Sequence, residues 1–113
     1  MSGTKLDNDK PSFWLIPHEP LLEVAKVLTY GASKYEEDPH DRNYLRVEDG
    51  ERRYLDAVLR HMNSHLRGEK SDPESGLSHL AHAASSLLMA MGWRSARPGD
   101  TPTYAWGEDD TKP

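Results

Sequence analysis

Residues 77–91 read LSHLAHAASSLLMAM, and this stretch decides the fold. Its apolar residues recur every three or four positions, which is the period of one face of an α-helix: Leu77, Leu80, Ala81, Ala84, Leu87, Leu88 and Met91. Small alanine and serine residues between them permit another helix to approach closely. We expect a long helix with Asp72 as its N-cap, Pro73 in its first position and its end near Trp93, before Pro98.

Two more helices precede it in the chain. Residues 51–67 carry an apolar stripe and are followed by Gly68, a typical residue just beyond a helix end. A helix from about Glu19 to Tyr35 shows the same period at Leu21, Ala25, Leu28 and Ala32. Residues 36–50 have no periodicity and predict a long loop. No strand-like alternation is present, so the sequence predicts an all-α protein, a small bundle of three to four helices in which the last two pack antiparallel.

The length of 113 residues fits one compact domain. Residues 1–11 are predicted to be a flexible arm, residues 12–96 the helical domain and residues 97–113 an acidic tail. Between Pro11 and Pro17, the apolar strip Phe13–Ile16 is expected to lie extended over a groove or a partner subunit.

Composition excludes several classes of protein. Lys and Arg number 14 against 19 Asp and Glu, a net charge of −5, which argues against binding duplex nucleic acid. The absence of cysteine excludes disulfides and thiolate metal sites. No apolar run approaches the roughly 20 residues that span a bilayer, and the first ten residues lack a signal peptide, so we expect a cytoplasmic protein without a membrane partner. With 35% hydrophobic residues, the core is thin, which favours a homo-oligomer.

Histidines and carboxylates gather around the turn before the last helix. His79 and His82 are three residues apart, so they project from one helix face and could share a metal ion or flank a substrate; equally, they could cover a subunit interface. His61 and His65 lie on the preceding helix. Glu69, Asp72 and Glu74 fall between the two helices, where Asp72 and Glu74 are also explained by helix capping and the helix dipole.

Further acids and cations complete this set. Glu19 and Glu23 are one helical turn apart and could hold a hard divalent cation, or Glu23 could simply lie in solvent near Lys26. Seven cations could recognise phosphate if a cleft gathers them: Lys34, Arg42, Arg46, Arg52, Arg53, Arg60 and Arg67. The pattern suits metal-assisted hydrolysis of a phosphorylated small molecule.

The motifs resemble a known family. In order, they are Trp14-Leu15-Ile16-Pro17, the run Leu22 to Tyr35, Arg60-His61, Arg67-Gly68-Glu69 and Asp72-Pro73-Glu74-Ser75-Gly76-Leu77-x-His79-Leu80-Ala81-His82-Ala83. Residues 10–92 thereby resemble the phage dATP/dGTP diphosphohydrolases of MazZ type, which are related to the MazG-like all-α pyrophosphohydrolases. The resemblance implies a homodimer or homotetramer that uses Mg²⁺ or Mn²⁺ to hydrolyse dGTP and dATP to the monophosphate and pyrophosphate. It also implies a phage enzyme of the host cytoplasm whose dGMP product supplies 2-aminoadenine nucleotides.

The resemblance also suggests roles for individual residues. MazG-like enzymes carry Glu-x-x-Glu and Glu-x-x-Asp metal motifs, whereas His79 and His82 stand where Glu-x-x-Asp is expected. Imidazole ligands would favour Mn²⁺ or a softer ion; alternatively, the imidazoles bind phosphate while carboxylates hold the ions. The expected metal ligands are Glu23, Glu69, Asp72, His79 and His82. The expected catalytic residues are Glu23, Glu69 and His61, and the expected substrate-binding residues are Lys34, Tyr35, Asn43 and Arg60, with Tyr44 or Trp14 stacking on the base.

Two other functions compete with this one. A non-enzymatic helical adaptor would use the Phe13–Ile16 strip for docking. A phosphohydrolase of the His-Asp type requires a His-Asp pair on a helix, whereas His40-Asp41 falls in the long loop.

Overall fold

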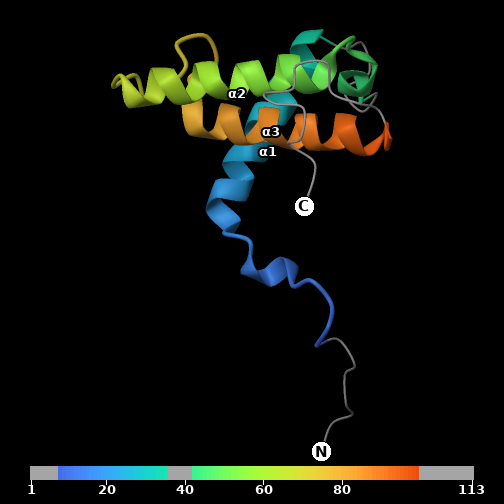
Figure 1. Cartoon of the computed structure of the whole chain (residues 1–113). Coiled ribbons are helices and arrows are strands. Elements are labelled where there is room, and N and C mark those ends of the chain that lie inside the picture. Colours follow the sequence, from blue (N-terminus) through green and yellow to red (C-terminus); the bar gives the residue numbers. More distant parts are fainter. Residues whose placement is uncertain (1–7, 36–41, 100–113) are drawn as a thin grey trace, which may run out of the picture.

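The described part of the chain contains three α-helices (Figure 1). The computed structural model describes residues 8–35 and 42–99, and these residues contain no β-strand. None of the helices in that part of the chain combines the length and the apolar character needed to cross a bilayer. The elements are η1 (Phe13–Leu15), α1 (His18–Tyr35), η2 (Asn43–Arg46), α2 (Gly50–Leu66) and α3 (His79–Ser95), where η denotes a 3₁₀ helix. The all-α prediction is therefore confirmed.

Helices α2 and α3 lie side by side and antiparallel (Figure 1), as the short connection between them predicted. Arg94 near the end of α3 donates hydrogen bonds of 2.9 and 3.3 Å to the carboxylate of Glu51 at the start of α2. Such a fork-shaped contact fixes how the two helices align along their axes. Helix α1 packs on α3, while its N-terminal part and η1 project away from the pair (Figure 1).

The core is narrow and consists of small side chains. Its buried apolar residues are Val24, Val27, Ala81, Ala83 and Ala90. Ser85 is fully buried and its hydroxyl lies 2.8 Å from the Ala81 carbonyl on its own helix and 3.3 Å from the Val24 carbonyl on α1. Only a small residue permits this close approach of two helix backbones, as the alanine and serine pattern of α3 indicated.

Helix α2 ends as the sequence predicted. The backbone N–H of Glu69 donates to the Ser64 carbonyl and that of Gly68 to the His65 carbonyl, both at 3.0 Å. Gly68 has φ +104°, a conformation that glycine adopts readily. These two hydrogen bonds form a Schellman motif, which satisfies the last carbonyls of the helix.

The predicted start of α3 is wrong. The helix begins at His79, and its N-cap is Ser78, whose hydroxyl accepts a 3.0 Å hydrogen bond from the Ala81 N–H. Asp72 instead closes a separate turn, in which its Oδ1 accepts the N–H groups of Glu74 (2.8 Å) and Ser75 (3.1 Å). Aspartate competes well for nearby N–H groups, and Gly76 at φ +75° takes the chain out of helical geometry.

The Phe13–Ile16 strip is not extended, contrary to the prediction. Residues Phe13–Leu15 form a 3₁₀ turn, with hydrogen bonds from Leu15 N–H to the Ser12 carbonyl (3.2 Å) and from Ile16 N–H to the Phe13 carbonyl (3.0 Å). The turn satisfies these backbone groups locally, and the side chains of the strip are exposed in the single chain. Most of the predicted arm and tail and the loop residues 36–41 lie outside the described residues.

A tryptophan attaches the segment before α2 to the end of α3. The Trp93 indole N–H donates a 2.8 Å hydrogen bond to the Val47 carbonyl. The Arg97 guanidinium lies 3.9 Å from the centre of the Trp93 ring, a cation–π contact, and donates to the Leu45 carbonyl at 2.5 Å. Gly50 at the start of α2 faces the same ring so closely that a Cβ would collide with it. This contact positions η2 and the arginines around it.

Candidate active site

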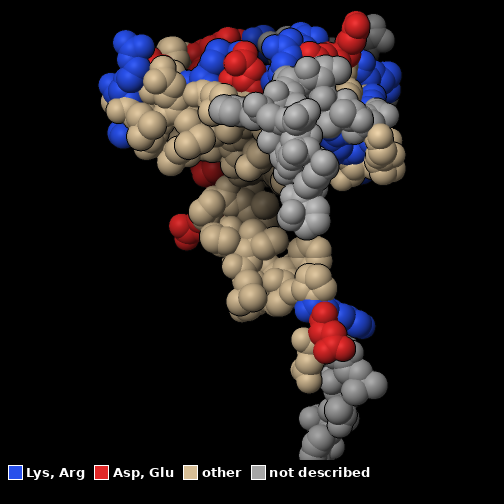
Figure 2. Space-filling model, viewed as in Figure 1, with Lys and Arg blue, Asp and Glu red and all other residues tan. Residues whose placement is uncertain are grey.

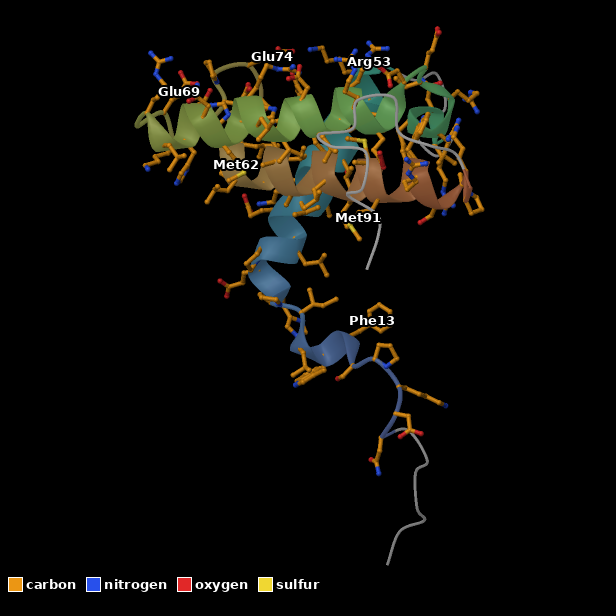
Figure 3. The ribbon with its side chains drawn as sticks, viewed as in Figure 1. Phe13, Arg53, Met62, Glu69, Glu74 and Met91 are labelled. Carbon is orange, nitrogen blue, oxygen red and sulfur yellow. The ribbon has the colours of Figure 1, made fainter. Side chains whose placement is uncertain are left out.

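A cavity of about 1000 Å³ lies between the three helices, η2 and the α2–α3 turn. Five cations line it: Lys34, Arg42, Arg52, Arg53 and Arg60. Figure 2 shows charged side chains gathered along the α2 side of the molecule, whereas the projecting α1 is mostly uncharged. Arg53 and Glu74, which both line the cavity, lie on that same side, far from Phe13 (Figure 3).

Carboxylates hold several of these cations in place. Arg60 lies 2.5 Å from Asp56 one helical turn away, and Lys34 of α1 pairs with Glu74 of the turn. The Tyr30 hydroxyl donates a 2.8 Å hydrogen bond to Glu74. Lys34 and this hydroxyl lower the pKa of the Glu74 carboxyl. Because these pairs are exposed, they contribute little stability, but they orient positive groups toward the cavity.

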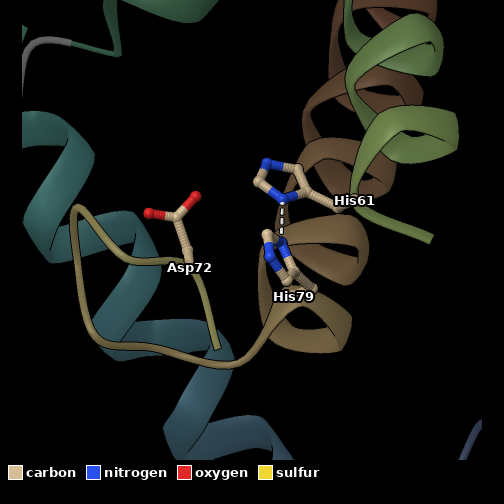
Figure 4. Close-up of side chains that lie close together, drawn as sticks. All are labelled: His61, Asp72 and His79. Carbon is tan, nitrogen blue, oxygen red and sulfur yellow. Dashed lines mark hydrogen bonds between the residues drawn. The ribbon is translucent and has the colours of Figure 1, made fainter. Parts of the chain in front are cut away.

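A cluster of three histidines borders one part of the cavity. His79 is 3% exposed, and its Nε2 lies 2.7 Å from Oε1 of Glu69. The Nδ1 atoms of His79 and His61 are 2.8 Å apart (Figure 4). The His82 ring stacks on His61, with ring centres 4.6 Å apart, and its Nε2 lies 2.7 Å from the Ser75 hydroxyl. His61 and His82 line the cavity directly.

The environment of the cluster lowers the pKa of two of its imidazoles, those of His61 and His82, and that of the Asp72 carboxyl. Burial lowers the pKa of His61, and the neighbouring His82 and His79 lower it further. Burial likewise lowers the pKa of His82, against the opposing attraction of Asp72. For Asp72, burial raises the carboxyl pKa, but hydrogen bonds from the Ser75 and Glu74 N–H groups outweigh it, and the net pKa is lowered. Neutral imidazoles and a carboxylate are the protonation states that bind a cation.

These donors fit a divalent metal ion. One ligand atom each from His61, Asp72 and His79 lies within 4.8 Å of the other two. Figure 4 shows Asp72 on the turn facing the two histidines, which come from α2 and α3. Nitrogen and oxygen donors that converge from three separate segments suit such an ion.

Most of the site residues expected from the sequence are brought together. His61, Glu69, Asp72, His79 and His82 form the cluster and its immediate contacts. Lys34, Arg60 and Tyr44 line the adjoining cavity.

Other expected residues lie elsewhere. Glu23 is on α1, where it pairs with Lys26 at 3.0 Å and takes no part in the cluster. Asn43 is in η2 and is not among the residues that line the cavity. Trp14 is 80% exposed on the projecting segment. The side chain of Tyr35 and the His40-Asp41 pair lie outside what the structure describes.

Sequence reasoning missed several residues of the site. Tyr30 and Tyr54 line the cavity, and Glu74, which the sequence placed at the turn, also joins that turn to α1. Ser75 holds His82 and also accepts the Leu77 N–H at 3.1 Å. No local pattern identifies these contacts, since Tyr30 and Glu74 are 44 residues apart. The density of polar residues in Asp72–Gly76 was the one signal that could have drawn attention to Ser75.

Comparison with known proteins identifies the family. The family described as dATP/dGTP diphosphohydrolase, N-terminal, matches residues 1–101. A curated protein of Salmonella phage PMBT28, named dATP/dGTP diphosphohydrolase, is 38% identical over 98 residues, which are 87% of this chain and 32% of that protein. The chain thus spans about a third of the length of this relative. No solved structure matches. Because the match covers most of its length, the chain belongs to the family of dATP/dGTP diphosphohydrolase N-terminal domains.

Proposed function

We propose that the chain hydrolyses purine deoxynucleoside triphosphates, dGTP and dATP, to the monophosphate and pyrophosphate. The observation that carries this proposal is the placement of five cations around a cavity that adjoins a cluster of imidazoles and a carboxylate. The name of the phage relative supports the choice of substrate.

The cavity suits the substrate in size. Small-molecule sites in proteins commonly enclose about 300–1000 Å³, and this cavity is at the upper end of that range. A nucleoside triphosphate is a large, highly charged ligand, so it needs both the volume and the positive lining.

Cationic side chains would bind the triphosphate. Arg60 adjoins His61 on α2 and lines the cavity, so its guanidinium can contact phosphate oxygens next to the histidine cluster. Lys34 reaches the same cavity from α1. Each cation now contacts a carboxylate, Asp56 or Glu74, and phosphate would compete for the same N–H donors. A charge-assisted hydrogen bond is worth about 1.5–3 kcal/mol, which makes such contacts important for substrate affinity.

Aromatic residues would contact the base. Tyr44 and Tyr54 line the cavity and pack edge to face, with ring centres 6.4 Å apart. Tyr54 also donates a 3.1 Å hydrogen bond to the Tyr44 carbonyl, which fixes its ring. Rigid aromatic walls favour a flat purine at low cost in conformational entropy.

A divalent ion, which the family resemblance implies is Mg²⁺ or Mn²⁺, would supply Lewis acidity at the cluster by offsetting phosphate charge and activating water. His61, Asp72 and His79 are the residues that would hold it. His82 stacks against His61 and limits the rotation of that ring. Arg60 would offset the charge that develops on the departing pyrophosphate.

We also propose that the protein works as a homo-oligomer. Phe13, Trp14 and Leu15 are about 80% exposed, and α1 projects beyond the rest of the fold (Figure 1). Met62 and Met91 are exposed on the side of α2 and α3 from which α1 projects (Figure 3). An apolar surface of this extent is typical of an interface, and a second copy would bring the projecting segment of one chain onto this face of the other.

The biological setting follows from the substrate. We propose a role in remodelling the nucleotide pool of a phage-infected cell, in the cytoplasm, with dGMP passing to the synthesis of 2-aminoadenine nucleotides. This proposal is supported by the sequence resemblance and by the phage relative.

The test is a turnover assay on the full chain. Each deoxynucleoside triphosphate is incubated with the protein and Mg²⁺ or Mn²⁺, and products are separated by ion-exchange chromatography. We expect monophosphate and pyrophosphate from dGTP and dATP. Lys26 is an exposed cation outside the cavity. The control variant Lys26→Gln should therefore hydrolyse dGTP and dATP at the same rate as the native chain. Nucleotide binding without any turnover would overturn the hydrolase proposal and leave a binding module.

A further inference from the structure

We infer that His61, His79 and Asp72 form a site for one first-row transition-metal ion in preference to Mg²⁺, and that Glu69 is a positioning residue for His79 and not a ligand. The inference deepens the proposed function, on which the use of this ion in hydrolysis rests. The site itself is argued from the contacts of its donor atoms.

The contacts of His79 define which nitrogen is available to an ion. A carboxylate can only accept hydrogen bonds, so the 2.7 Å contact between Glu69 and His79 places a hydrogen on Nε2. In the neutral form of His79, Nδ1 then carries no proton, so its lone pair is available and faces His61. Histidine ligands of metals typically donate their other ring N–H to a carboxylate in this way. Glu69 contacts Nε2 of His79, the nitrogen that would not bind the ion. Glu69 therefore orients the His79 ring and is not itself a metal ligand.

His61 supplies the second nitrogen. Its Nδ1 lies 2.8 Å from Nδ1 of His79, so without an ion it donates a hydrogen bond across that gap. Two nitrogen ligands at about 2.0–2.2 Å from one ion lie roughly 3 Å apart. The rings therefore need only a small displacement and a change of the His61 tautomer to share an ion. Stacking on His82 holds the His61 ring close to this position.

Asp72 supplies an oxygen from a rigid turn. Its Oδ1 is fixed by the N–H groups of Glu74 and Ser75, and the turn is closed by a 2.8 Å hydrogen bond from the Gly76 N–H to the Asp72 carbonyl. Its carboxylate faces both histidines (Figure 4). Three ligands leave further coordination positions for substrate, and both His61 and Asp72 line the cavity.

The donor set decides the class of ion. Two imidazoles and one carboxylate suit divalent ions such as Mn²⁺, Fe²⁺ and Co²⁺. Magnesium prefers oxygen ligands and loses its water reluctantly. A site in which two of three ligands are nitrogen therefore disfavours Mg²⁺.

The experiment measures metal binding to the full chain without nucleotide. Co²⁺ is titrated by calorimetry and by its visible absorption, in the presence and absence of a hundredfold excess of Mg²⁺. We expect one Co²⁺ per chain and no displacement by Mg²⁺. The variants His61→Gln, His79→Gln and Asp72→Asn should each weaken binding at least tenfold. His18→Gln, which removes a histidine outside the cluster, should leave binding unchanged.

Two features of the experiment distinguish loss of metal binding from loss of folding. Asp72→Asn retains the Oδ1 acceptor and so the turn, and circular dichroism of each variant shows whether it is folded. No Co²⁺ binding by the native chain, binding unchanged in either histidine variant, or displacement of Co²⁺ by the hundredfold excess of Mg²⁺ would overturn the inference.

The role of Glu69 has its own readout. Long-range ¹H–¹⁵N NMR should show His79 with its proton on Nε2 in the native chain, a mixture of tautomers in Glu69→Ala and recovery in Glu69→Gln. Co²⁺ affinity should fall about 10- to 100-fold in Glu69→Ala and recover in part with glutamine. An unchanged tautomer in Glu69→Ala would refute the positioning role.

The results also separate this inference from the proposed function. Turnover of dGTP with no Co²⁺ at the cluster would contradict only the inference. Co²⁺ bound at the cluster with no turnover of any deoxynucleoside triphosphate would contradict only the proposed function.

Discussion

The contact between Gly50 and Trp93 predicts a large effect of adding one methyl group. A Cβ built on Gly50 lies within 2.8 Å of three atoms of the Trp93 ring, well inside van der Waals contact. The ring cannot move freely, because its indole N–H is bonded to the Val47 carbonyl at 2.8 Å and its face is covered by the Arg97 guanidinium at 3.9 Å. Gly50→Ala must therefore displace the ring and lengthen that hydrogen bond.

The expected cost follows from these contacts. Overpacking typically costs about 1–3 kcal/mol, and loss of the indole hydrogen bond adds about 1 kcal/mol. The higher helix propensity of alanine offsets at most about 1 kcal/mol of this loss in the free energy of unfolding. We expect Gly50→Ala to lower the free energy of unfolding by about 2 kcal/mol, which for a domain of this size lowers Tm by roughly 10 °C.

Urea denaturation followed by circular dichroism measures the change. Gly31→Ala is the matched control, since a Cβ on Gly31 meets no atom within 4 Å and the residue is inside α1. It should leave stability unchanged or raise it by up to about 1 kcal/mol. If Gly50→Ala is as stable as Gly31→Ala, the packing of Trp93 against the start of α2 is refuted.

Four further predictions concern the site and the assembly. Arg60→Gln should raise KM for dGTP about 10- to 100-fold through loss of a charge-assisted hydrogen bond, whereas Arg67→Gln, outside the cavity, should not; steady-state kinetics on both variants checks this. Because the folded-state pKa of Glu74 is lowered, its contribution to stability is present above the ordinary carboxyl pKa and is lost as pH falls through the lowered value. The Tm difference between the native chain and Glu74→Gln should accordingly disappear in acid, and equal differences at pH 7 and pH 2 would contradict it. Chelation by EDTA should abolish turnover and added Mn²⁺ should restore it, while turnover that survives chelation would refute metal dependence. Light scattering should show an oligomer that Met91→Glu dissociates, whereas a native chain that is already monomeric would end the oligomer proposal.

Local patterns in the sequence were sufficient for the helices. The apolar period in residues 77–91 identified α3 as a helix, but not which face it buries. Leu80, Leu87, Leu88 and Met91 are exposed in the single chain, whereas small residues of α3 such as Ala83 and Ser85 are buried. Gly68 identified the end of α2, since its conformation depends on the hydrogen bonds of its own turn. These features depend on neighbours within a few residues.

Competition between local signals explains the misplaced start of α3. Asp72 and Ser78 are both good N-cap residues, and each accepts backbone N–H groups in the structure. Only the turn at Gly76, together with the hydrogen bond from the His79 N–H to the Lys70 carbonyl, decides between them. That choice depends on how the chain folds back on itself, which composition does not reveal.

The candidate site was predictable in its chemistry but not in its geometry. The sequence placed histidines and carboxylates near one turn, and the cluster formed there. It did not reveal that Glu69 contacts His79, or that His61 rather than His82 joins Asp72 and His79. Those contacts depend on how α2 and α3 are rotated relative to each other, which the sequence pattern does not specify.

One measurement tests the central claim most directly. A crystal structure of the chain with Mn²⁺ and a dGTP analogue that cannot be cleaved between its α and β phosphates would locate the substrate and the ion together. The account predicts the triphosphate in the cavity against Arg60 and Lys34, with Mn²⁺ on His61, Asp72 and His79. A nucleotide bound away from this cavity, with side chains packed around the three ligands, would contradict it.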